Sequence, residues 1–65
     1  MRVTIDSKTW KEWNGETGLV IAWYNAAWSD TNEAMRVGLV RLDSVYVAGM
    51  ALSVRFPESE LIEIT

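Results

Sequence analysis

The 65-residue sequence predicts one small all-β domain whose five short strands close into a barrel. Two observations lead to this fold class. Apolar runs rich in β-branched and aromatic residues recur along the chain, and clusters of turn-forming residues separate them. A long first loop and a one-turn break before the last strand complete the pattern of a small barrel. The length leaves room for a single domain, spanning residues 1–65.

The first half of the chain predicts two strands joined by a long loop. Polar and apolar residues alternate over 2–6, which is the pattern of a half-buried strand. Residues 7–18 are mostly polar, and Gly15 and Gly18 supply the backbone freedom that a turn needs. Residues 19–24, LVIAWY, have no polar break, so we expect a strand that is covered on both faces.

The next connection, residues 25–34, leads to a second apolar strand. Turn-forming residues lie within it, and a single helical turn over 30–35 is the alternative to a plain loop. It offers only two carboxylates and no glycine, which makes it a poor calcium loop. Residues 36–42, RVGLVRL, predict a strand that ends in a turn at 43–44, Asp-Ser.

The last third of the chain predicts shorter pieces of structure. Gly49 indicates a bulge, a bend or a hairpin tip, and we expect strand pieces near 45–48 and 51–56. Residues 57–60, PESE, can form a 3-10 turn because proline tolerates the first turn of a helix. Residues 61–64 predict a short final strand.

A barrel would give these strands one common interior. Closure hides the sheet edges that would otherwise pair with other chains. The apolar residues expected to line this interior are Val3, Ile5, Val20, Val37, Leu39, Val54, Phe56, Leu61 and Ile64.

Two short motifs carry a resemblance to a known group of folds. They are Gly15-x-x-Gly18 ahead of an apolar strand, and Val54-Arg55-Phe56 ahead of Leu61. In this pattern the chain resembles SH3-like barrels, nearest to the photosystem I stromal barrel subunit and the variable chain of ferredoxin–thioredoxin reductase, and more loosely to nitrile hydratase β-chains. The resemblance covers most of the chain and implies an accessory role, docking onto a larger complex through loops and one barrel face.

A narrower resemblance concerns residues 18–24, GLVIAWY. They are similar to the G-x-I-V-G-W-Y strand of the type B plasmid dihydrofolate reductases, which are SH3-like barrels that form tetramers around one active pore. The functional V-Q-I-Y strand of that family corresponds to residues 54–57, where this chain has VRFP, so the pore residues are replaced. This resemblance implies the alternative function: a small-ligand-binding or enzymatic oligomer with a site formed between subunits.

Composition argues against several classes of protein. The net charge is −3 and the six basic residues are scattered, whereas nucleic-acid binders cluster Lys and Arg. Cysteine and histidine are absent, so we expect no disulfide, no metal and no cofactor. The longest apolar stretch, 18–28, is too short to span a bilayer and no signal peptide is recognisable. We expect a cytoplasmic protein that binds neither nucleic acid nor membrane.

No catalytic site is predicted. Acid–base catalysis needs titratable groups held together in a cleft, and the candidates are Glu58, Glu60 and Glu63. A simpler interpretation is a solvated acidic edge that discourages aggregation. A non-enzymatic role is therefore favoured.

Four tryptophans in 65 residues are the unusual feature of the composition. A barrel this small has room for one or two large rings, so at least two tryptophans should be partly exposed. Trp and Tyr are enriched at protein interfaces. The predicted interaction residues are Trp10, Trp13, Trp23, Tyr24 and Trp28. In the alternative interpretation, Trp10 and Trp13 fold over the open end of the barrel as a plug.

The sequence favours a non-catalytic interaction or accessory module that self-associates, most simply as a homodimer, or docks on a protein partner. We expect residues 19–24 and the following loop to make the contact. Either Val20, Ala22 and Tyr24 or the residues alternating with them line the barrel, and the other set needs a cover. A symmetric dimer supplies one. The alternative cover is the loop 7–15, which would leave a monomer.

Overall fold

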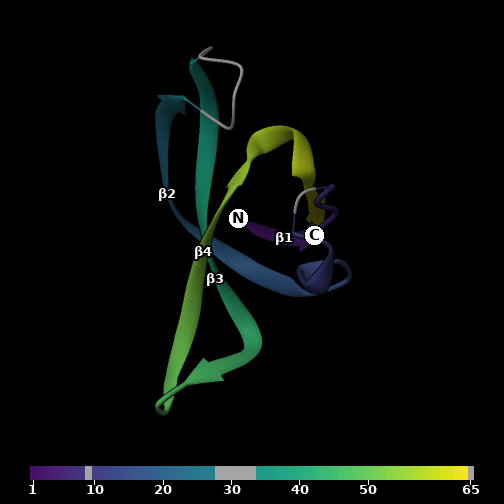
Figure 1. Ribbon diagram of the computed structural model, residues 1–65, viewed down its shortest axis with the longest axis vertical. Helices are drawn as coiled ribbons and strands as arrows, with labels where there is room; N and C mark the ends of the chain where they lie inside the picture. The colour runs from purple at the N-terminus through teal and green to yellow at the C-terminus, as the bar shows by residue number, and fades with distance from the viewer. Residues whose placement is uncertain (9, 28–33, 65) are drawn as a thin grey trace.

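In the computed structural model, which describes residues 1–8, 10–27 and 34–64, the secondary structure consists of β-strands and short 3-10 turns (Figure 1). Its five strands form one antiparallel sheet in the order β4-β3-β2-β1-β5. The elements in chain order are β1 (Arg2–Ile5), the 3-10 turn η1 (Lys11–Trp13), β2 (Thr17–Ala27), β3 (Ala34–Val47), β4 (Met50–Pro57), the 3-10 turn η3 (Glu58–Glu60) and β5 (Leu61–Ile64). The predicted all-β class, the five strands and the 3-10 turn before the last strand are confirmed.

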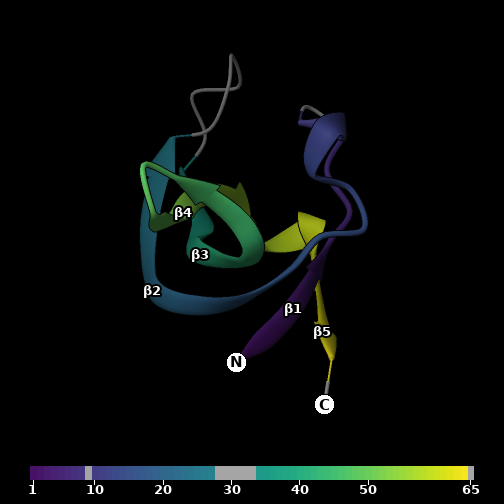
Figure 2. The ribbon, with the colours of Figure 1, turned by 90° about the horizontal axis from the view of Figure 1, so that it is seen from below.

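The sheet is curled rather than flat. β2 lies at its centre, paired with β1 on one side and β3 on the other, and β1 also pairs with β5 along its whole length. Figure 2 shows β2 sweeping from the β1–β5 pair round to β3 and β4. Among the described residues β4 and β5 do not pair, so the predicted barrel is not closed by a ladder between these two strands.

One cluster of buried side chains joins the two halves of the sheet. Val3 and Ile5 of β1, Val40 and Leu42 of β3 and Phe56 of β4 are each at most 1% exposed and contact one another as a group. β1 and β4 are not neighbours in the sheet, so the sheet must fold over a common interior for this group to form. Each large apolar side chain buried in this way stabilises the fold by about 1.5–3 kcal/mol.

The predicted core is largely confirmed, but the sequence pattern did not identify the inner face of β3. The predicted residues that are buried, or packed half-buried against the cluster, are Val3, Ile5, Val20, Val37, Val54, Phe56 and Leu61. Leu39 and Ile64 are only half-buried, whereas Val40 and Leu42 are fully buried. Successive strand residues point to opposite faces, so Leu39 shares its face with exposed Arg41.

β2 contains a β-bulge at Ile21. The register with β3 shifts between Val20 and Ala22, which leaves Ile21 without a partner residue. An extra residue reverses the alternation of faces, so Val20 and Trp23 lie on the same side of the strand. Neither predicted alternating set is therefore correct. The strand is also not covered on both faces as predicted, since Ile21 is 47% exposed.

The predicted turn at Asp43–Ser44 is wrong, because β3 continues through these residues. Between the pairs Arg41–Ser53 and Tyr46–Ala51, four residues of β3 lie opposite one residue of β4. The excess residues form a wide irregularity, where β3 bends without reversing direction.

The chain reverses instead at Ala48-Gly49, which confirms the hairpin tip among the predicted alternatives for Gly49. Val47 pairs with Met50, and the two residues between them have φ angles of 52° and 81°. Two consecutive positive φ angles are characteristic of the type I′ turn, whose twist matches that of the flanking strands. This turn makes β3 and β4 a hairpin that ends away from η1 and β5 (Figure 1).

Asp43 lies in the irregular part of β3 and connects this strand to β1 and β2. Its carboxylate forms an ion pair with Arg2 and accepts a hydrogen bond of 2.7 Å from the Thr17 hydroxyl. The hydrogen bonds from Arg2 and then from Thr17 hold the pKa of Asp43 below its ordinary value. The charged form of Asp43 is therefore favoured by folding.

We expect the substitution Asp43→Asn to lower the stability at neutral pH and to have less effect in acid. A carboxylate whose pKa is lower in the folded state contributes stability above its unfolded pKa of about 3.9 and loses it as the pH falls further. Thermal unfolding followed by circular dichroism near neutral pH and below about pH 3 measures this difference. Asp6→Asn, the same change at an exposed site, is the control. If the loss of stability in Asp43→Asn were the same in acid as at neutral pH, the charged Asp43 carboxylate would not be its cause.

Candidate functional site

The predicted interaction residues do not gather in one place. Trp10 and Trp13 lie in the connection between β1 and β2, at η1. Trp23 and Tyr24 are successive residues of β2 and so point to opposite faces of the sheet. Trp28 lies outside the described residues.

The loop before β2 holds its two tryptophans in different environments. Trp13 is half-buried and packs against the core cluster, as the plug interpretation expects, whereas Trp10 is 42% exposed. The buried Ser7 hydroxyl accepts a hydrogen bond of 2.9 Å from the Trp10 amide. The Gly15 amide donates to the Ile5 carbonyl at 3.0 Å, which fixes the end of the loop against β1. The loop therefore covers the core near β1 with one ring and leaves the other at the surface.

Trp23 is covered in part by its own chain. The guanidinium carbon of Arg36 lies 4.3 Å from the centre of the indole ring, which is a cation–π contact. Gly38 lies opposite Trp23, and a β-carbon at Gly38 would approach the ring to 3.0 Å. The indole is thus packed closely against β3, and its availability to another molecule is reduced.

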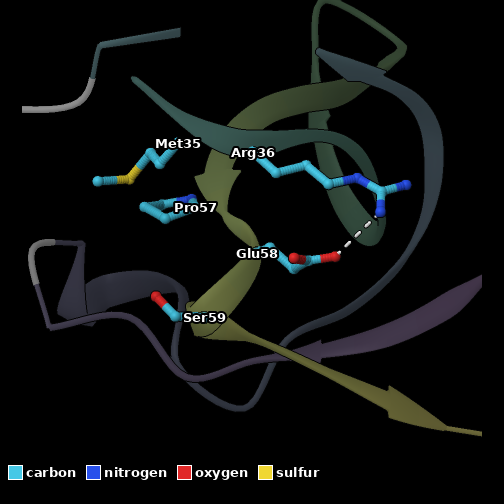
Figure 3. Close-up of a pocket in the computed structure, with 5 residues that line it drawn as sticks. All are labelled: Met35, Arg36, Pro57, Glu58 and Ser59. Carbon is cyan, nitrogen blue, oxygen red and sulfur yellow. Dashed lines mark ion pairs between the residues drawn. The ribbon is translucent and has the colours of Figure 1, made fainter. Parts of the chain in front are cut away.

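The same arginine lines a shallow depression between β3 and η3. Arg36 also forms an ion pair of 3.4 Å with Glu58, and both side chains are about half exposed. The depression has a volume of about 230 Å³ and is lined by Met35, Arg36, Pro57, Glu58 and Ser59 (Figure 3). Ligand sites usually measure about 300–1,000 Å³, so this one is of a size for a single side chain.

Tyr24, on the opposite face of β2, is also engaged within the chain. The guanidinium carbon of Arg55 lies 5.6 Å from the centre of its ring. Its hydroxyl is buried and finds no hydrogen-bond partner among the described residues. The ring therefore contacts the Arg55 side chain of β4, and its hydroxyl is withdrawn from the surface.

Of the large apolar side chains in the described part of the chain, the most exposed lie at the tip of the β3–β4 hairpin. Tyr46 is 63% exposed, Val47 60% and Met50 73%. These three residues were not among the predicted interaction residues, which were chosen from the tryptophans and Tyr24. The signal in the sequence is the uncharged run VYVAGMA over residues 45–51 around a turn glycine. Such a run has no charge to protect an exposed edge.

The three glutamates near the C-terminus do not form one constellation. Glu58 is paired with Arg36, Glu60 is half-buried in η3, and Glu63 is exposed on β5. Within residues 1–8, 10–27 and 34–64, no three His, Cys, Asp or Glu side chains lie close enough to hold a metal ion.

A helix able to cross a bilayer is not found among the described residues. No protein-family model, no curated protein and no solved structure matches this chain.

Proposed function

We propose that this chain is an SH3-like barrel that serves as a non-catalytic interaction module and associates with itself. Three features support the barrel: the strand order β4-β3-β2-β1-β5, the 3-10 turn directly before β5, and a core shared by β1 and β4. The curled sheet and the common interior are what a small barrel requires.

The observation that carries the interaction role is the apolar hairpin tip, which we define as Tyr46, Val47 and Met50. All three side chains are more than half exposed, and the residues between them carry no charge. Val47 and Met50 pair on one face of the hairpin and Tyr46 lies on the other, so the tip exposes apolar side chains on both faces. Exposed apolar surface of this kind marks sites of protein interaction when it forms a larger patch. A homodimer buries such a surface with one patch on each chain.

The hairpin tip supports this role better than the β2 surface that the sequence pattern favoured. Trp23 lies beneath Arg36, and Tyr24 contacts Arg55. Ile21 is the large apolar residue of β2 that stays about half exposed. We therefore place the contact at the hairpin tip.

Sedimentation equilibrium tests the proposal. We expect the wild-type protein to show a mass above that of the 7.4 kDa chain at high micromolar concentration. Tyr46→Ser and Met50→Ser should each shift the mass toward the monomer, because each removes apolar area from the contact. Both positions are exposed, so both variants should keep the wild-type circular dichroism spectrum.

Ile62→Ser is the matched control, since Ile62 is 52% exposed on β5, away from the hairpin. It should leave the mass unchanged. A wild-type protein that remains monomeric would refute self-association. A mass that responds to Ile62→Ser and not to the tip variants would place the contact on β5.

A further inference from the structure

The two edges of the sheet differ in length and in charge. β5 is four residues long and includes Glu63, whereas β4 is eight residues long and its one charged residue is Arg55. Proteins protect exposed edges by keeping them short or charged, because an unpaired row of N–H and C=O groups recruits other strands. By this criterion β5 is protected and β4 is not.

We infer that the free edge of β4 pairs antiparallel with β4 of a second copy of this chain, which joins two sheets into one of ten strands. This inference rests on the proposed self-association and specifies its geometry. A two-fold axis at Ser53 places Ser53 opposite its own copy and Arg55 opposite Ala51. No two like charges then face each other, so the edge is electrostatically compatible with itself.

The same geometry covers the part of the hairpin tip that belongs to β4, which is Met50. Met50 begins β4 and pairs with Val47, so both side chains point to the inner face of the hairpin, as does Phe56. In the paired sheet Met50 comes to lie opposite Phe56 of the second copy. Pro57 ends the ladder at the other end of β4, since proline has no N–H to donate. One contact thus covers the unpaired backbone edge and the Met50 side chain, whereas Tyr46, which pairs with Ala51, lies on the opposite face of the hairpin.

A second copy of this chain is favoured over another partner because the β4 edge can pair with itself without an electrostatic conflict. When β4 runs antiparallel to its own copy, the unpaired backbone groups find partners and Arg55 lies opposite the uncharged Ala51, so no like charges meet. The chain has a net charge of −3, so an anionic membrane surface would repel it as a whole.

Charge substitutions at Ser53 test the inferred pairing. Ser53 is exposed and lies at the axis, so Ser53→Glu and Ser53→Lys should each weaken the dimer several-fold through like-charge opposition. An equimolar mixture of the two variants should recover the dimer, because opposite charges then face each other. Ser44→Glu and Ser44→Lys, at an exposed serine of β3, are the matched controls and should leave the mass unchanged alone and mixed.

A cysteine substitution gives a second readout that does not depend on destabilising the dimer. The chain has no cysteine, so Ser53→Cys introduces a single thiol at the axis. Mild oxidation should cross-link it to a covalent dimer much faster than Ser44→Cys. A dimeric wild type with no effect at Ser53 and no preferential cross-link would overturn the β4 pairing while leaving self-association intact. A wild-type protein that stays monomeric would overturn both the β4 pairing and the self-association. If that monomer floated with phosphatidylcholine vesicles, the occupant of the β4 edge would be a lipid surface instead of a second copy.

Discussion

Replacing Phe56 with alanine is expected to remove a large share of the free energy of unfolding. Phe56 is fully buried and connects β4 to the β1 side chains of the core cluster. Truncating a buried phenylalanine to alanine costs about 3–5 kcal/mol. A chain of this length has a total stability of about 3–10 kcal/mol, so the substitution removes about 30% of it or more. Urea denaturation followed by tryptophan fluorescence measures the loss.

Two further substitutions make this result specific to the shared core. Phe56→Leu keeps most of the side-chain volume and should cost less than half as much as the alanine variant. Ile62→Ala changes a side chain that is 52% exposed and should alter the stability by about 0.5 kcal/mol or less. If Phe56→Ala were no more damaging than Ile62→Ala, the sheet would not fold over the interior described above.

The sequence predicted the fold well at positions where a single residue determines the local backbone geometry. Pro57 marked the end of β4 and the start of the 3-10 turn, and Gly49 marked the hairpin tip. Periodicity failed where the strand is irregular. An extra residue at Ile21 reverses the faces of β2, and excess residues around Asp43 let β3 bend without a turn. Local composition does not show whether an Asp-Ser pair reverses the chain or pairs with a distant Arg2.

The candidate site was harder to predict for a related reason. The tryptophan content predicted that several aromatic side chains would be exposed. In the structure, cation–π contacts from Arg36 and Arg55 cover Trp23 and Tyr24 in part. Arg36 comes from β3 and Arg55 from β4, two other strands of the sheet, so their contacts depend on strand order and register. The apolar tip at Tyr46 and Met50 becomes visible as a surface only once the hairpin is known to end there.

The substitution Gly18→Ala is expected to be the most damaging change of a single methyl group in the chain. Gly18 is buried in β2 between Val3 of β1 and Leu42 of β3. A β-carbon at Gly18 would lie 2.6 Å from the carbonyl oxygen of Arg41 and 2.6 Å from a methyl group of Val40. Sequence reasoning assigned this glycine to a turn, whereas the structure requires it for the close approach of two strands.

The loss of stability in Gly18→Ala depends on whether the atoms that the new methyl group would contact can move away. Overpacking a core by one methyl group costs about 1–3 kcal/mol, and more where the obstacle cannot rotate away. The Arg41 carbonyl belongs to the backbone of β3, so relief requires the β2–β3 pairing itself to open. We therefore expect a loss at or above the upper end of that range, measured by urea denaturation.

Gly15→Ala is the matched control, because the same methyl group meets nothing within 4 Å there. Its cost comes from the positive φ of 86° alone, about 1–2 kcal/mol for a residue with a β-carbon, and the less flexible unfolded chain offsets part of it. Gly18→Ala should thus destabilise the protein more than Gly15→Ala, although sequence reasoning treated the two glycines alike. Equal losses would mean that β2 and β3 do not approach as closely at Gly18 as the register requires.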